Sequence, residues 1–180
     1  MNNQSLFDCL HECVRTRGVR DIREAEELAL IPSAIYYAEQ LKRSSDERRA
    51  YFLGMFEKFT ETDLIFFDPD KGIEVRSVKS GSKKSPEYLS WNKLKEAFAR
   101  GHSVLIYQHF PHENNRQFVT RITDEIRKST DAKQIDAFIT SKVVFFLASQ
   151  EKHQMVRRNL VEKVEERWHG QIRVENSVTE

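Results

Sequence analysis

The sequence predicts an α/β fold: a three-layer, Rossmann-like, mostly parallel sheet with a terminal antiparallel hairpin and a helical N-terminal segment. Residues 64–67 form the apolar run Leu-Ile-Phe-Phe, which is typical of a strand buried on both faces. Helical apolar stripes alternate with such runs through the second half. Only Thr140, Ser141 and Lys142 separate the runs 135–139 and 143–147, so these two strands must form a hairpin.

Length and composition indicate a single domain over residues 1–180, with a helical segment at 1–60 and the α/β core at 61–175. The 180 residues are 39% hydrophobic and 11% aromatic, which is enough for a substantial core. A formal net charge of +1 provides no global field for a polyanion. No apolar stretch approaches the roughly 20 residues that span a bilayer, and no signal peptide is visible. We therefore expect a cytoplasmic protein without membrane contact.

The first sixty residues carry helical patterns. Capping residues and apolar spacing predict helices over 5–18 and 21–32, the second of which ends at Pro32. A third helix begins at Ser45, and its predicted apolar face contains Ala50, Leu53, Phe56 and Phe59.

Helices and strands then alternate. We expect a helix over 91–98 that stops at Gly101, a buried strand over 103–107, and a helix whose apolar residues lie between 118 and 126. The final helix is predicted to bury Val156, Leu160, Val164 and Trp168, and a short edge strand is predicted at 172–174.

Polar residues follow the two predicted parallel strands. Asp68, Pro69 and Asp70 end the first, and Tyr107, Gln108 and His109 end the second. Ligands of parallel α/β sheets bind beyond the carboxyl ends of the strands, so these residues are expected to converge on one pocket. His109, with an ordinary pKa near 6.5, is a candidate acid or base. Alternatively, Gln108 and His109 satisfy open backbone groups at the strand end.

A long basic loop follows, over about 71–87. Loops beyond about 12 to 15 residues without their own structure tend to be functional or disordered. Its composition predicts a basic flap that binds substrate by covering an anionic ligand. Alternatively, it is a solvated charged loop. The candidate substrate-binding residues at and around it are Lys71, Arg76, Lys79, Lys83, Lys84 and Tyr88.

Residues 63–70, Asp-Leu-Ile-Phe-Phe-Asp-Pro-Asp, resemble motif IV of the class I S-adenosylmethionine-dependent methyltransferases that methylate amino groups. The stretches 68–72, 82–88 and 107–109 are also similar to a group of bacterial proteins with an Asp-Pro-Asp-x-Gly strand end. The resemblance covers about 45–150. It implies the last half of that fold, whose last strand runs antiparallel. It also implies that Asp68 and the Pro69 carbonyl hold the target amine.

Two departures qualify this resemblance. The family binds its cofactor at a glycine-rich turn, whereas residues 1–60 contain only Gly18 and Gly54. Asp70 and Lys71 replace the second proline and the aromatic residue that stacks on a base, which leaves Tyr88 or Tyr107 as substitutes. The leading prediction is a methyltransferase-like protein acting on or bound to nucleic acid, with S-adenosylmethionine as a candidate cofactor.

Two other functions remain open. Asp68, Asp70 and Glu74 could bind Mg²⁺, a hard cation that takes one or two carboxylates plus substrate phosphates. With His109 as the base, this is a nuclease or phosphodiesterase site. The third possibility is a non-catalytic subunit that binds a protein partner or a second copy, at Trp91, Trp168 or the final strand.

Overall fold

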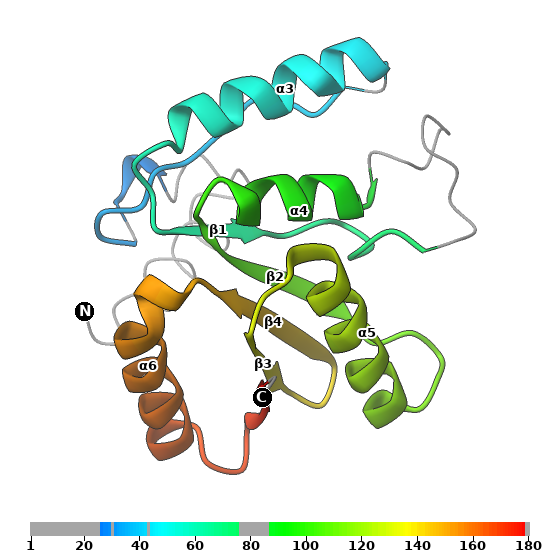
Figure 1. Cartoon of the computed structure of the whole chain (residues 1–180), viewed down its shortest axis with the longest axis vertical. Helices are drawn as coiled ribbons and strands as arrows, with labels where there is room; N and C mark the ends of the chain where they lie inside the picture. Colours follow the sequence, from blue (N-terminus) through cyan, green and yellow to red (C-terminus); the bar gives the residue numbers. More distant parts are fainter. Residues whose placement is uncertain (1–25, 30, 43, 76–86, 179–180) are drawn as a thin grey trace, which may run out of the picture. The chain divides into compact units, whose positions relative to one another are not determined.

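The computed structural model describes residues 26–29, 31–42, 44–75 and 87–178 (Figure 1). The chain divides into two compact units, Met1–Gln40 and Leu41–Glu180. The helix predicted over 5–18, and half of the one predicted over 21–32, lie outside the described residues. Helix α3, Ser45–Lys58, belongs to the second unit. The unit that contains the sheet therefore begins about twenty residues before the predicted core boundary at residue 61.

The second unit contains a mixed five-stranded sheet in the order β1-β2-β4-β3-β5. Only β1 and β2 pair in parallel; the other three pairings are antiparallel. The predicted α/β class is confirmed, but the prediction of a mostly parallel sheet is wrong. The hairpin turns β4 back between β2 and β3, and β5 adds to the other side of β3. The strands are Leu64–Phe67 (β1), Ser103–His109 (β2), Gln134–Ile139 (β3), Val143–Ser149 (β4) and Arg173–Val178 (β5).

Helices cover both faces of this sheet. Helix α4, Trp91–Ala99, contacts β2, and helix α5, Asn115–Thr130, contacts β3 and β4. On the opposite face, Val161 of α6, Gln154–Arg167, packs with Phe138 and Leu147. Side chains along a strand alternate between the two faces of a sheet. The strand register therefore places Phe138 and Leu147 on the face opposite to the buried Ile106. Figure 1 shows α5 and α6 on opposite sides of the sheet, so the unit has three layers.

Helix ends follow the capping signals in the sequence. Asn114 accepts a hydrogen bond from the Gln117 N–H at 3.1 Å and caps α5. Gly101 follows α4 with φ +93°, as expected of a glycine that ends a helix. Among the described residues, no helix is both long enough and apolar enough to cross a membrane.

The predicted apolar faces of two helices are only partly correct: Phe56 of α3 is buried and Val164 of α6 packs against the core, as predicted, but other predicted residues are exposed. In α3, Phe52, Met55 and Phe56 are buried, whereas Leu53 is 52% exposed. In α6, Val161 is buried, whereas Val156 is 72% exposed. The reason in α6 is that a charged residue, Arg157, occupies the inward face.

Arg157 forms a buried ion pair with Asp136, which lies in the middle of β3 and is fully buried. The Arg157 Nε–H donates to Asp136 Oδ2 at 2.6 Å, and a second guanidinium N–H donates to Oδ1. The hydrogen bond to Asp136 raises the pKa of Arg157, although burial opposes that rise. This bidentate pair sets the orientation of α6 on the sheet.

Arg157→Met should destabilise the protein by about 3 to 5 kcal/mol, because it leaves the Asp136 carboxylate buried without a partner. Urea unfolding followed by circular dichroism measures the effect. Arg158→Met removes the same charge from the neighbouring exposed position and should change stability by less than about 0.5 kcal/mol. Equal losses in the two variants would contradict the assignment of α6 orientation to the ion pair.

Candidate functional site at the carboxyl ends of β1 and β2

Asp68, Asp70 and His109 meet where the two parallel strands end. Phe67 pairs with Ile106, so the residues that follow β1 lie level with the last residues of β2, and the predicted pairing of these strands is confirmed. Burial raises the pKa of Asp68, and the nearby Asp70 carboxylate raises it further, whereas His109 lowers it. Asp70 and His109 are therefore close enough to Asp68 to influence its ionisation.

The chain turns sharply after Asp70, at Gly72. The Gly72 N–H donates to the Pro69 carbonyl at 3.1 Å, and Gly72 has φ +83°. A Cβ atom built on residue 72 would lie 2.1 Å from Gln108 Oε1. Glycine is therefore required here both by backbone conformation and by the space that Gln108 occupies.

Gln108 joins the loop after β1 to the end of β2. Its side-chain Oε1 accepts from the Ile73 N–H at 2.8 Å, and its Nε2 donates to the His109 carbonyl at 2.8 Å. The side chain is buried. Of the two expectations for Gln108, the one in which it satisfies backbone groups describes its contacts; its role is to position Asp70 and His109.

The two ends of the basic loop are tied together beside this turn. The Lys71 N–H donates to the Glu87 carbonyl at 2.9 Å, and the Leu89 N–H donates to the Gly72 carbonyl at 3.0 Å. The Lys71 ammonium also pairs with the Glu87 carboxylate at 2.5 Å, which raises the pKa of Lys71. Tyr88 is thereby held near the strand ends. The other four predicted basic residues, Arg76, Lys79, Lys83 and Lys84, lie outside the described residues.

Glu74 caps helix α4. Its Oε1 accepts from the Trp91 N–H at 2.9 Å, and its carbonyl accepts from the Trp91 indole N–H at 3.1 Å. A carboxylate at a helix N-terminus is stabilised by the helix dipole. In the described part of the chain, no group of three or more His, Cys, Asp or Glu side chains is arranged to hold a metal ion.

A groove with a volume of about 1040 Å³ opens beside the strand ends. It brings together six of the predicted site residues: Asp70, Lys71, Glu74, Tyr88, Gln108 and His109. Asp68, Pro69 and Tyr107 do not line it. Tyr107 lies on the opposite face of β2 from Gln108, where its ring packs edge-on against His109 and Phe145 at centroid distances of 4.9 and 5.3 Å.

Aromatic residues and α5 supply a wall that the sequence analysis missed. Phe110 and Phe118 pack edge to face at 5.9 Å, and the Arg121 guanidinium lies 5.3 Å from the Phe118 ring. Trp91 also lines the groove. The only sequence signal was the helical spacing of residues 118, 121, 125 and 128, which places them along one side of α5.

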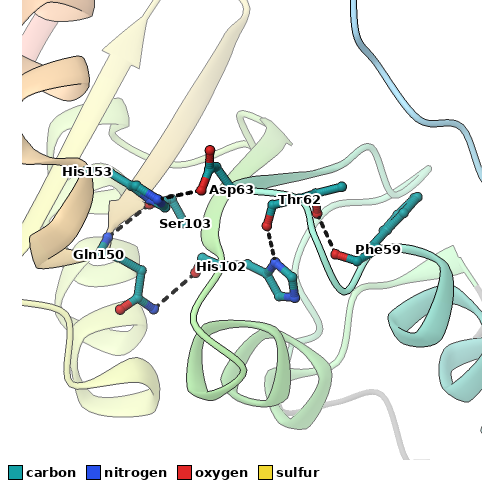
Figure 2. A network of polar contacts seen from close by, with 7 residues as sticks. All are labelled: Phe59, Thr62, Asp63, His102, Ser103, Gln150 and His153. Carbon is teal, nitrogen blue, oxygen red and sulfur yellow. Dashed lines mark hydrogen bonds and ion pairs between the residues drawn. The ribbon is translucent and has the colours of Figure 1, made fainter.

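A second polar cluster lies at the opposite ends of the same strands (Figure 2). His153 Nε2–H donates to Asp63 Oδ1 at 2.9 Å, and in that neutral tautomer the Ser103 hydroxyl donates to Nδ1 at 2.8 Å. Ser103 Oγ also accepts from the Gln150 N–H at 2.9 Å. The side-chain amide of Gln150 donates through Nε2 to the His102 carbonyl at 3.1 Å.

The hydrogen bonds link Ser103, His153 and Asp63 in the order of a hydrolase triad. They do not form a working triad, because substrate has no access to the serine hydroxyl. Ser103 is only 4% exposed, and its hydroxyl is held between His153 and the Gln150 N–H, so it is not open to a substrate carbonyl. The cluster instead ties the start of α6 to the starts of β1 and β2.

Comparison of the chain with protein-family models, with curated proteins and with solved structures found no match.

Gly72→Ala should destabilise the protein more than Gly170→Ala. Both glycines have a left-handed backbone, with φ +83° and +79°, but a Cβ at residue 170 has no heavy atom within 4 Å. Both variants incur backbone strain of about 1 kcal/mol, and Gly72→Ala adds about 1 to 3 kcal/mol for displacing Gln108. Chemical denaturation measures both, and equal losses would contradict the packing role of Gln108.

The pKa of Asp68 should respond to its two neighbours in opposite directions. Asp70→Asn should lower it, and His109→Gln should raise it, as measured by carboxyl-carbon NMR titration. Because the folded-state pKa lies above the ordinary 3.8, Asp68 favours folding at low pH, and that contribution is lost as the pH rises through the folded-state pKa. Asp68→Asn should therefore gain stability relative to wild type as the pH rises. An Asp68 pKa that neither variant moves would show that the three groups do not interact.

Proposed function

We propose that this protein is methyltransferase-like and holds an amine-bearing acceptor, within or bound to nucleic acid, at Asp68. The observation that carries the proposal is the position of Asp68 directly after a parallel strand, level with the end of β2 and close to Asp70 and His109. A carboxylate with a raised pKa accepts a proton more readily than an ordinary one. Asp68 would accept a hydrogen bond from the amine N–H, and His109 is placed to take up or return a proton.

Strand topology supports the same reading. The motif resemblance implies a strand that ends in Asp68 and a last antiparallel strand. In the described sheet, β1 ends directly before Asp68, and β4 runs antiparallel between β2 and β3. Strand β5 is an addition that the resemblance does not account for.

The acceptor would be held differently from the motif's usual arrangement. The Pro69 carbonyl already accepts from the Gly72 N–H, so only its second lone pair is left for an amine. Tyr107 packs between His109 and Phe145, whereas Tyr88 lines the groove. Tyr88 is therefore the better candidate for the stacking group.

The described residues fit S-adenosylmethionine poorly. Gly54 lies within helix α3 rather than in a turn after a strand, and Gly18 is outside the described residues. No strand precedes β1 in the described ranges. The described residues thus support a site for the methyl acceptor, but not one for the cofactor.

A second candidate is a Mg²⁺-dependent phosphodiesterase, which one observation favours. Asp70 raises the pKa of Asp68 because the two carboxylates repel each other, and a divalent cation bound between them would relieve that repulsion. Mg²⁺ needs only one or two carboxylates when substrate phosphates complete its shell. Glu74, committed to capping α4, is the weakest of the three predicted ligands.

Calorimetric titration with S-adenosylmethionine, and separately with Mg²⁺, should distinguish the two candidates in wild type and Asp68→Asn. Methyl transfer predicts saturable heat with S-adenosylmethionine and methylation of a single-stranded oligonucleotide that Asp68→Asn abolishes. Asp131→Asn is the control, because it removes the same charge from an exposed helix end where φ is +60°, a conformation that asparagine tolerates.

Saturable Mg²⁺ binding that requires Asp68, with no response to S-adenosylmethionine, would overturn methyl transfer and favour the phosphodiesterase. Silence in both titrations would overturn both enzymatic functions.

A further inference from the structure

Acidic and basic side chains both line the groove. Among the described residues its lining contains four carboxylates, Asp70, Glu74, Glu113 and Glu125, and three cationic groups, Lys71, Arg121 and Lys128. Glu74 is engaged as the cap of α4. Two of these cationic groups are already paired. Lys71 pairs with Glu87, and Arg121 lies between Glu113 at 2.6 Å and Glu125 at 3.8 Å.

Asp70 is the carboxylate that this balance leaves open. Among the described residues, none forms a hydrogen bond or an ion pair with its side chain, which is exposed and lines the groove. The Lys71 ammonium is close enough to feel the Asp70 charge but is paired with Glu87. Asp68 adds a second negative charge nearby. An anion at this end of the groove would meet repulsion from both, whereas a cation would be attracted by both.

The rest of the groove is apolar and aromatic. Its wall contains Tyr88, Trp91, Phe110 and Phe118, with the apolar side chains of Ile73 and Ile122. The Trp91 ring is held in place, because its indole N–H donates to the Glu74 carbonyl at 3.1 Å. Fixed aromatic faces bind planar rings and attract cations.

We propose that this groove binds an aromatic ammonium ligand, with the ammonium at Asp70 and the ring against the aromatic wall. Charge complementarity carries the assignment: the open carboxylate of Asp70 lies beside an apolar wall, and Lys71 and Arg121 are engaged by carboxylates, which leaves Lys128 on α5 as the third cationic group. The volume of about 1040 Å³ is at the upper end for small-ligand pockets. The inference goes beyond the proposed acceptor site at Asp68 and does not depend on methyl transfer.

Three probes that share the 2-phenylethyl group test this assignment: 2-phenylethylammonium, 2-phenylethanol and 3-phenylpropionate, which carry a positive, a neutral and a negative group at the same end. The chain contains two tryptophans, and Trp168 lies at the end of α6, away from the groove. In a Trp168→Phe background, fluorescence therefore reports on Trp91 alone. Calorimetry on the same samples detects binding that leaves the fluorescence unchanged.

The ammonium should bind more tightly than the alcohol, and the carboxylate most weakly. Asp70→Asn should weaken ammonium binding about tenfold, as expected for loss of one charged hydrogen bond, and leave the alcohol unaffected. Asp131→Asn, with the same change in net charge, should leave all three affinities unchanged.

The proposal is overturned if the carboxylate binds as tightly as the ammonium, if Asp70→Asn has no effect on the ammonium, or if calorimetry detects no binding of the ammonium. None of these outcomes bears on Asp68 or on S-adenosylmethionine, so failure here is distinguishable from failure of the proposed function.

Discussion

The side chain of Gln108 is the contact on which the strand-end site depends. It fills the space beside Gly72, accepts the Ile73 N–H, and donates to the His109 carbonyl. One buried amide thus positions the loop that carries Asp70 against the strand that carries His109. A buried amide with both of its ends bonded is costly to replace, because any shorter side chain leaves backbone groups unpaired.

The two ends of the parallel pair have opposite characters. At the start of the strands, Ser103, His153 and Asp63 satisfy one another, and the Gln150 side chain closes the cluster (Figure 2). At the carboxyl ends, the Asp70 carboxylate instead raises the pKa of Asp68. Uncompensated charge destabilises a fold, so its place at a strand end beside a groove is typical of a binding or catalytic site. The hydrogen-bonded cluster at the strand starts contributes stability. The carboxylates at the strand ends supply the candidate chemistry.

The orientation of α6 follows from the buried pair between Arg157 and Asp136. Once the Arg157 guanidinium reaches Asp136 on β3, Val161 and Val164 on the same side of the helix pack against the sheet, and Val156 faces away. An apolar stripe read from sequence assumes that charged residues face solvent. That assumption fails wherever an ion pair is buried. In α6 the buried ion pair makes the inward face of the helix differ from the face predicted from the apolar residues.

Local sequence signals determined the elements: the strand at 64–67, the hairpin around residues 140–142, the helix stop at Gly101, and the polar residues Asp68, Asp70 and His109 at the ends of two strands. These depend on interactions within a few residues, whereas the pairing of those two strands joins distant segments of the chain. Tertiary structure decided the antiparallel majority of the sheet, the inward faces of α3 and α6, and the aromatic wall of the groove. It also gave Gln108 its positioning role. Each of these depends on which side chains from distant segments meet, and hydrophobic periodicity along the chain carries no information about such partners.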